Sequence, residues 1–153
     1  MEMARVGFDL RWWSGTTVHY VENLLRALAV QGREKFHFVC YGHGPGRQVV
    51  AELDGTAEFR QIPWSNYSVQ GQVLLPRLLR RDCIQLFHSP FYMMPFLSRV
   101  PTIVTIHDTI PFFKYTDHRG LKRMTICAPD RLDDSLSTKL LYIGAVDRKF
   151  RGE

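Results

Sequence analysis

Cysteine is scarce in this sequence: the 153 residues include three, Cys40, Cys83 and Cys127. They are odd in number and widely spaced, and no C-x-x-C pattern occurs. Disulfide frameworks and zinc sites need paired or closely spaced cysteines, so we predict neither a disulfide nor a metal site. Cys40 and Cys83 lie in apolar segments, and we expect both to be small core residues.

Long apolar runs are also absent. No stretch approaches the roughly 18 consecutive apolar residues of a membrane-spanning helix. The N-terminal segment lacks the small-residue cleavage site of a signal peptide. Together with the sparse cysteines, these absences lead us to expect a cytoplasmic protein.

The excess of positive charge is small, with 20 Lys and Arg against 15 Asp and Glu, a net charge of +5. Such a balance admits nucleic acid, an anionic membrane or a phosphorylated substrate as partner, but it identifies none of them. No recognised nucleic-acid motif occurs, so we expect no nucleic-acid partner. With 45% hydrophobic and 23% charged residues, the composition is that of a folded globular chain and excludes disorder, collagen and coiled coil.

Short apolar segments alternate with amphipathic ones. The apolar segments predict strands at 4–9, 36–41, 58–62, 84–88 and 102–106. Apolar residues at spacings of three and four predict two helices. The first begins with Thr16 or Thr17 as its N-cap and ends at Gly32, and the second covers 69–81, where Pro76 marks a kink or a late start. This alternation predicts an α/β fold, a Rossmann-like parallel sheet flanked by helices.

Polar loops follow three of the predicted strands, at 11–17, 88–90 and 107–108. In parallel sheets, ligands bind at the carboxyl ends of the strands, so we expect the site at this edge. His88 and Ser89 are neighbours on an extended chain and point to opposite faces, and no G-x-S-x-G elbow is present. A turn closed by Pro90 is therefore favoured over a serine nucleophile.

A glycine-rich loop over 42–46 does not match a dinucleotide-binding fingerprint. It follows the second predicted strand instead of the first, Pro45 has no N–H to donate, and no clean helix is predicted after it. A nicotinamide-dependent enzyme is therefore disfavoured.

The residues at the strand ends resemble the N-terminal domain of glycosyltransferase family 4. The matching stretches read FHSP at 87–90 and VPTIVTIHDTIP at 100–111. The start of the chain matches too, in Gly7-Phe8-Asp9 with Arg11, Ser14-Gly15, and Tyr20 with the residues 23–28. The resemblance covers residues 5 to about 115 and implies one half of a GT-B fold.

The resemblance implies retaining transfer of a sugar from a nucleotide sugar to a glycan or lipid-linked acceptor, as in polysaccharide biosynthesis. It implies no metal and no bound cofactor, since the nucleotide sugar is a co-substrate. This domain would bind the acceptor and form one wall of the donor cleft. Catalysis in a cleft needs both walls to orient the donor and to stabilise the leaving diphosphate, so we expect the chain alone to be inactive.

His107 is the candidate catalytic residue, because the matching histidine of the family lies beside the donor sugar. An imidazole there can hydrogen-bond a sugar hydroxyl without carrying a fixed charge. The alternative is a histidine bonded to a loop backbone. His88 is expected to line the cleft, and Asp108 either touches the ligand or holds the loop by binding backbone N–H groups.

The first loop supplies the other candidate substrate-binding residues. Gly15 and Thr16 precede or begin the first helix, whose free N–H groups suit a diphosphate. Side chains at 16–18 oppose a close backbone approach, and the alternative is an ordinary capped helix. Trp12 and Trp13 either stack on an acceptor sugar or cover the edge of the sheet.

The stretch 140–149 resembles the first strand and loop of the second GT-B domain, although it comes early, and we expect only this remnant of that domain. The predicted division is a domain at 1–115, an irregular segment or linker at 116–139, and a remnant of a C-terminal domain at 140–153.

A second hypothesis is a non-catalytic remnant that binds a sugar, a membrane or a partner. Arg77, Arg80 and Arg81 flank leucines on the second helix, which is typical either of peripheral contact with the inner membrane face or of a solvated helix face. The exposed cleft wall also suggests a homodimer.

Overall fold

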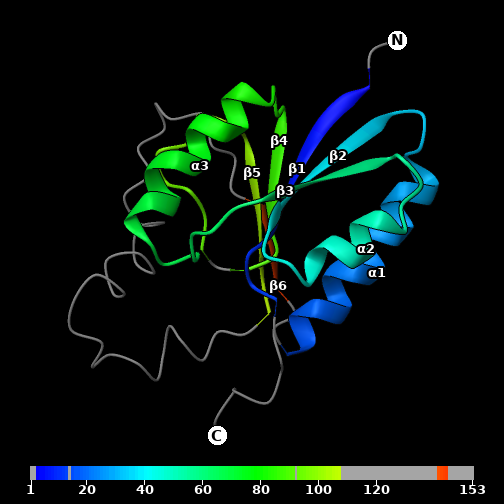
Figure 1. The fold of residues 1–153 in the computed structure, drawn as a ribbon, viewed down its shortest axis with the longest axis horizontal. Helices are drawn as coiled ribbons and strands as arrows, with labels where there is room; N and C mark the ends of the chain where they lie inside the picture. The colour runs from blue at the N-terminus through cyan, green and yellow to red at the C-terminus, as the bar shows by residue number, and fades with distance from the viewer. Residues whose placement is uncertain (1–2, 14, 92, 108–140, 145–153) are drawn as a thin grey trace, which may run out of the picture.

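The computed structural model describes residues 3–13, 15–91, 93–107 and 141–144 (Figure 1). The strands are β1 (Ala4–Leu10), β2 (Phe36–Gly42), β3 (Ala57–Gln61), β4 (Leu86–Ser89), β5 (Thr102–Ile106) and β6 (Leu141–Gly144). The helices are α1 (Thr16–Gln31), α2 (Gly46–Ala51) and α3 (Val69–Arg81).

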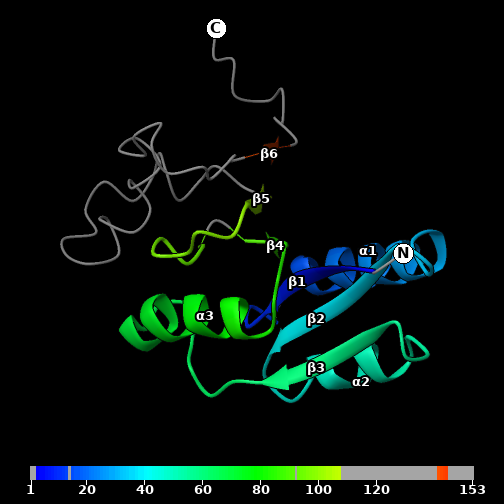
Figure 2. The ribbon, with the colours of Figure 1, turned by 90° about the horizontal axis from the view of Figure 1, so that it is seen from above.

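The strands form a six-stranded sheet in the order β3-β2-β1-β4-β5-β6, and each neighbouring pair is parallel. Helices α1 and α2 lie on one side of the sheet and α3 lies on the other (Figure 2). The predicted α/β class, a Rossmann-like parallel sheet flanked by helices, is confirmed. All strand carboxyl ends therefore point to one edge, where β1, β4 and β5 lie side by side.

Two apolar clusters hold the layers together. The cluster between the sheet and α1 with α2 includes Phe8, Leu25 and Phe38. The cluster between the sheet and α3 includes Tyr41, Leu75 and Phe87. Because β1, β2 and β4 carry buried side chains on both faces, they have the near-continuous apolar sequences of central parallel strands.

Helix α1 ends where the sequence indicates, because Gly32 is the C-cap and its N–H bonds the Leu28 carbonyl. Helix α3 begins at Val69, with the hydroxyl of Ser68 accepting from the Gly71 N–H at 3.0 Å. Pro76 lies buried inside α3, so the expectation of a late start is wrong. The packing of Leu75 and Leu79 against the sheet outweighs the one backbone hydrogen bond that Pro76 removes.

Two further expectations are corrected by the structure. Cys40 is buried as predicted, but Cys83 is exposed, because it occupies a turn after α3 with φ 54. A short helix, α2, does follow the glycine-rich loop, with Pro45 as its N-cap in a helical conformation (φ −61, ψ −36). Six residues are too few for an apolar period to be visible in the sequence.

Strand β6 pairs with β5, with Ile103 opposite Leu141, so 141–144 extend the same sheet. The segment 116–139 and Cys127 lie outside the described residues. The division into domains at 115 and 140 stays a prediction.

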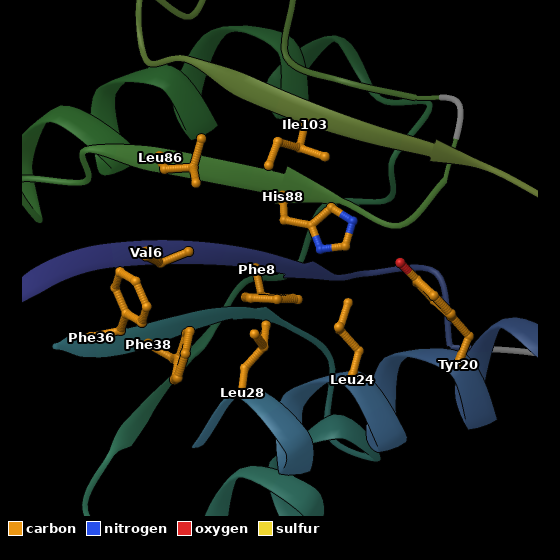
Figure 3. A pocket seen from close by; sticks show the side chains of 10 residues that line it. All are labelled: Val6, Phe8, Tyr20, Leu24, Leu28, Phe36, Phe38, Leu86, His88 and Ile103. Carbon is orange, nitrogen blue, oxygen red and sulfur yellow. The ribbon is translucent and has the colours of Figure 1, made fainter. Parts of the chain in front are cut away.

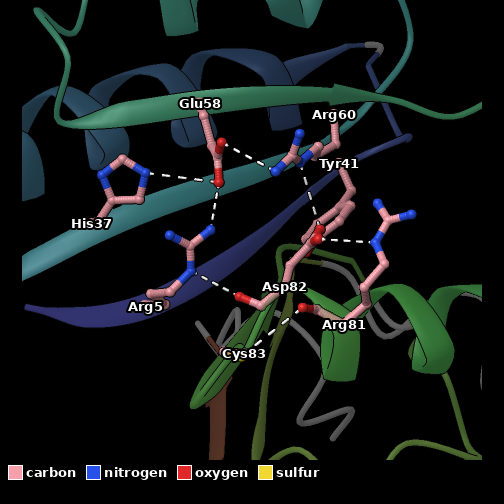
Figure 4. A network of polar contacts seen from close by, with 8 residues as sticks. All are labelled: Arg5, His37, Tyr41, Glu58, Arg60, Arg81, Asp82 and Cys83. Carbon is pink, nitrogen blue, oxygen red and sulfur yellow. Dashed lines mark hydrogen bonds and ion pairs between the residues drawn. The ribbon is translucent and has the colours of Figure 1, made fainter.

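A polar network runs across β1, β2 and β3, from Arg5 near the start of β1 to Tyr41 and Arg60 near the ends of β2 and β3 (Figure 4). The buried Tyr41 hydroxyl donates to Asp82 at 2.8 Å, and Arg5 donates to the Asp82 carbonyl at 2.7 Å. Arg5 also pairs with Glu58 of β3. Burial and the Asp82 carboxylate raise the pKa of Tyr41, so its hydroxyl stays protonated. The network ties the end of α3 to three strands, and these contacts between elements indicate a structural role.

Candidate functional site

A hydrogen-bonded cluster joins α1, β4 and β5 near the carboxyl edge of the sheet. The Thr105 hydroxyl lies 2.9 Å from His88 Nε2 and 3.2 Å from the Tyr20 hydroxyl. Thr105 and His88 are buried. Because one hydroxyl can donate to one neighbour and accept from another, Thr105 satisfies both side chains at once. The cluster fixes the orientation of Tyr20 on α1.

His88 is neutral at physiological pH. Its pKa is lowered from 6.5 to about 4, chiefly by burial and also by the neighbouring His107, while Asp9 opposes the shift. Its ring packs edge-on against Phe8 at 4.9 Å. His88 therefore faces the layer between α1 and the sheet, as the side chain of a buried strand residue.

His107 lies at the end of β5 and is exposed, as expected for the ligand edge. Its Nε2 lies 3.1 Å from the Pro90 carbonyl, and its ring meets Tyr20 edge-on at 4.7 Å. A carbonyl only accepts, so Nε2 carries the hydrogen, and in the neutral form of the ring Nδ1 is the acceptor. The loop-backbone bond is therefore present, and a catalytic role for His107 stays a prediction.

Gly15 is the N-cap of α1, with φ 62 and ψ −149, a conformation that strains residues with a Cβ. The expectation that Thr16 or Thr17 caps this helix is wrong. Both lie in its first turn, Thr17 is buried, and no side chain of the described residues caps α1. Glycine was favoured here by backbone geometry, which outweighs the capping preference of threonine. The N-cap of α1 therefore offers no side chain to the first-turn N–H groups, which lie at the carboxyl edge of the sheet.

The two tryptophans separate to opposite sides of the sheet edge. Trp12 stacks on Phe91, with ring centroids 4.2 Å apart and planes 12° apart, and meets Tyr67 edge-on at 6.0 Å. Trp13 packs against the core cluster under α1. Trp13 therefore covers the edge of the sheet. Trp12 instead belongs to a half-exposed aromatic group with Phe91 and Tyr67.

Ser89 holds a turn. Its hydroxyl lies 2.9 Å from the Phe91 carbonyl and 2.5 Å from the Met93 carbonyl. His88 and Ser89 end β4 and the chain bends after them, at Pro90 and Phe91, so the turn comes later than predicted. The Ser89 hydroxyl is engaged with its own loop and His88 bonds Thr105 instead, so the two do not form a nucleophile pair.

Sequence reasoning assigned no role to the residues that organise this edge. Asp9 and Arg11 form a buried ion pair, with Arg11 Nη2 2.6 Å from Asp9 Oδ2. Tyr20 and Thr105 connect the two histidines. Their signal in the sequence was weak, because Tyr20 continues the apolar stripe of α1 and Thr105 lies in an ordinary β-branched strand.

Some candidates lie elsewhere or outside the structure. Asp108 lies outside the described residues. Arg77, Arg80 and Arg81 are exposed on α3. Within the described ranges, no group of three potential metal ligands occurs, and no helix is long and apolar enough to cross a membrane.

Comparison with known proteins gives structural similarity only. No family model matches the sequence, and no curated protein matches it. A chain of an O-GlcNAc transferase mutant from Thermobaculum terrenum superposes with a TM-score of 0.47 and 15% identity, over 69% of this chain and 21% of that one. Anabaena Alr3699/HepE in complex with UDP and glucose superposes with a TM-score of 0.44 and 14% identity, over 70% of this chain and 30% of that one. This chain thus spans less than a third of either protein, and similarity at this level assigns neither family nor activity.

Proposed function

We propose that this chain is the acceptor-side domain of a retaining GT-B glycosyltransferase resembling family 4. The complete enzyme would transfer a sugar from a nucleotide sugar to a glycan or lipid-linked acceptor. The observation that carries the proposal is the meeting of two features at one edge. The N-terminus of α1, whose N-cap Gly15 has no capping side chain, and the exposed His107 are linked through Tyr20, which lies on α1 and contacts the His107 ring.

Each feature suits one part of a nucleotide sugar. Free N–H groups and the positive end of the α1 dipole attract a diphosphate, and no acidic residue stands in the first turn to oppose it. Gly15 has open space where a Cβ would stand. His107 Nδ1 can accept a hydrogen bond from a sugar hydroxyl. The inward burial of Thr17 removes one of the side chains expected to obstruct the approach.

Trp12 supports the acceptor side of the proposal. It stacks on Phe91 beside Tyr67, which is 39% exposed. A half-exposed aromatic group at the ligand edge suits the apolar face of a sugar ring. Asp108 and His88 stay secondary candidates, the latter because it is buried.

The proposed enzyme needs a second domain for turnover. In this proposal the edge forms one wall of a cleft, and its buried Arg11 is already paired with Asp9, so within the described residues the helix terminus is the group offered to a leaving diphosphate. We expect this chain to bind a nucleotide sugar weakly and to transfer no sugar.

The test is calorimetric titration of the 153-residue chain with UDP-glucose. His107→Ala should weaken binding at least tenfold, while His19→Ala, an exposed histidine on α1, should leave it unchanged. Gly15→Ala should weaken binding as well, with circular dichroism used to confirm that α1 is intact. The proposed site would be refuted if wild type and His107→Ala bind equally well, or if wild type binds none of several nucleotide sugars. Sugar transfer by the purified chain would refute its inactivity.

Peripheral membrane contact is part of the proposal for a lipid-linked acceptor. The exposed arginines Arg77 and Arg80 lie on α3 with Val69, which is 65% exposed. Basic and apolar side chains together bind anionic lipid surfaces. Cosedimentation with phosphatidylglycerol vesicles should fall in Arg77→Gln/Arg80→Gln and should not change in Arg33→Gln. Sedimentation equilibrium tests the proposed homodimer.

A further inference from the structure

A cavity of about 270 Å³ lies between α1 and the sheet (Figure 3). Its lining comes from α1, β1, β2, β4 and β5: Val6, Phe8, Tyr20, Leu24, Leu28, Phe36, Phe38, Leu86, His88 and Ile103. Among these lining residues, Tyr20 and His88 are the two whose side chains carry a polar atom. The cavity is therefore an apolar chamber with its polar groups at one place.

The walls of the chamber are largely aromatic. Phe8 meets Phe38 edge-on at 5.8 Å and His88 edge-on at 4.9 Å. Leu24 and Leu28 point from α1 toward these rings (Figure 3). His88 is neutral at physiological pH, and no Asp, Glu, Lys or Arg belongs to the described lining. Such a lining rejects charged groups, because burying an unpaired charge is costly.

The polar end of the chamber lies toward the carboxyl edge of the sheet. There the Tyr20 hydroxyl and His88 Nε2 both bond the Thr105 hydroxyl. A three-member chain of this kind has acceptor capacity to spare, because the Tyr20 and Thr105 hydroxyl oxygens each have two lone pairs. An added hydroxyl can join it without leaving a group unpaired.

The size of the cavity limits what can occupy it. One turn of α-helix about 10 Å across takes up about 400 Å³, so a docking helix does not fit inside. Apolar cavities of about 150 Å³ stay dry and take up small hydrocarbons such as benzene. A single flexible hydrocarbon chain fits both the volume and the lining.

We propose that this cavity binds the hydrocarbon chain of an uncharged single-chain alcohol, whose hydroxyl lies at the Tyr20–Thr105 end. The site is additional to the proposed nucleotide-sugar site and does not depend on sugar transfer. Its apolar walls provide the affinity, and the hydroxyl chain at one end sets the direction in which the ligand enters.

The first test measures the binding of 1-decanol to the full 153-residue chain by calorimetry and by the rise in thermal midpoint. Leu24→Trp fills the cavity from α1, and Ile103→Trp fills it from β5. Val30→Trp is the matched control, because Val30 lies on α1 and is 80% exposed. Binding should be retained in wild type and Val30→Trp and weakened at least tenfold in both filled variants. Equal binding in all four proteins, or no binding to wild type, would overturn the proposal.

The second test addresses the polar end and stands even if the filled variants do not fold. Tyr20→Phe removes one hydroxyl and keeps the ring. It should weaken 1-decanol several-fold and leave decane unaffected. An equal effect on both ligands would show that the hydroxyl chain does not receive the head group. Because no nucleotide is present, failure of the proposed sugar-transfer function leaves both results unchanged.

Discussion

Replacing Asp9 by asparagine removes the negative member of a buried ion pair. The Asp9 carboxylate accepts from Arg11 three times, from the backbone N–H at 3.0 Å, from Nε at 2.9 Å and from Nη2 at 2.6 Å. The two side chains are 2% and 1% exposed. The Arg11 guanidinium cannot lose its proton, and its Nη1 already has no partner within the described part of the chain.

Breaking a buried pair costs about 3–5 kcal/mol, because the remaining charge stays buried and uncompensated. Asparagine keeps one oxygen that can accept from Arg11, so we expect the lower end, about 3 kcal/mol. This is a large share of the about 5–15 kcal/mol that stabilises a typical domain. With a urea dependence of about 2 kcal/mol per molar, the unfolding midpoint should fall by about 1.5 M.

Urea unfolding followed by tryptophan fluorescence measures the effect. The matched control is Glu52→Gln, which breaks the Arg26–Glu52 pair, 2.8 Å apart but 46% and 49% exposed. Solvent screening keeps that exposed pair weak, so the unfolding midpoint of Glu52→Gln should change little. Asp9→Leu/Arg11→Met, which removes both charges, should recover most of the loss. If Asp9→Asn and Glu52→Gln lower the midpoint equally, burial is not what makes this pair strong.

Burial and close packing lead to three further predictions. The pKa of His88 is about 4 in the folded protein and 6.5 as a free group, so between these pH values only the unfolded chain binds the proton. The free energy of unfolding should therefore be at its full value above pH 6.5 and fall by about 3 kcal/mol as the pH drops to 4. His88→Gln should reduce that pH dependence, and thermal melts between pH 7.5 and pH 4 that are the same for both proteins would contradict the assignment. Gly71→Ala should destabilise by about 1–3 kcal/mol, because an added Cβ would lie 2.7 Å from Arg11 Nη1; in chemical denaturation Gly44→Ala, with nothing within 4 Å, should change little. Cys83 should react with a thiol reagent in the native protein and Cys40 only after unfolding, since burial raises the pKa of Cys40. If mass spectrometry after brief alkylation finds Cys40 labelled before Cys83, Cys40 is not buried.

The strands and the two longer helices were predictable, because their apolar spacing reflects packing that the whole segment shares. Strand β5 matches its predicted range, with Thr102 and Ile106 at its ends. Local features were less predictable. At the start of α1, a positive φ that suits glycine outweighs the preference for a threonine cap. At Cys83, a turn conformation exposes a side chain whose neighbour Ile84 is buried.

The candidate site was only partly visible in the sequence. The strand-end motif predicted that His107 would lie at the ligand edge. The contacts among Tyr20, His88 and Thr105 depend on the sheet order and on the register that sets His88 opposite Ile103. Neither the sheet order nor the register can be read from residue spacing along the chain. The Thr105 hydroxyl between Tyr20 and His88 could therefore not be predicted from the sequence.

The position of β1 in the middle of the sheet has a consequence for biosynthesis. Its residue Ala4 pairs with Phe36, whereas Val6 also pairs with Leu86, which is synthesised much later. On a ribosome that adds about 5–20 residues per second, β1 can join β2 and β3 within seconds, but its other edge stays open until β4 emerges. During that interval the nascent chain exposes an unpaired strand edge flanked by apolar side chains. We therefore expect chaperone dependence to be greatest for nascent chains that end between β3 and β4, and to decline once β5 has been made.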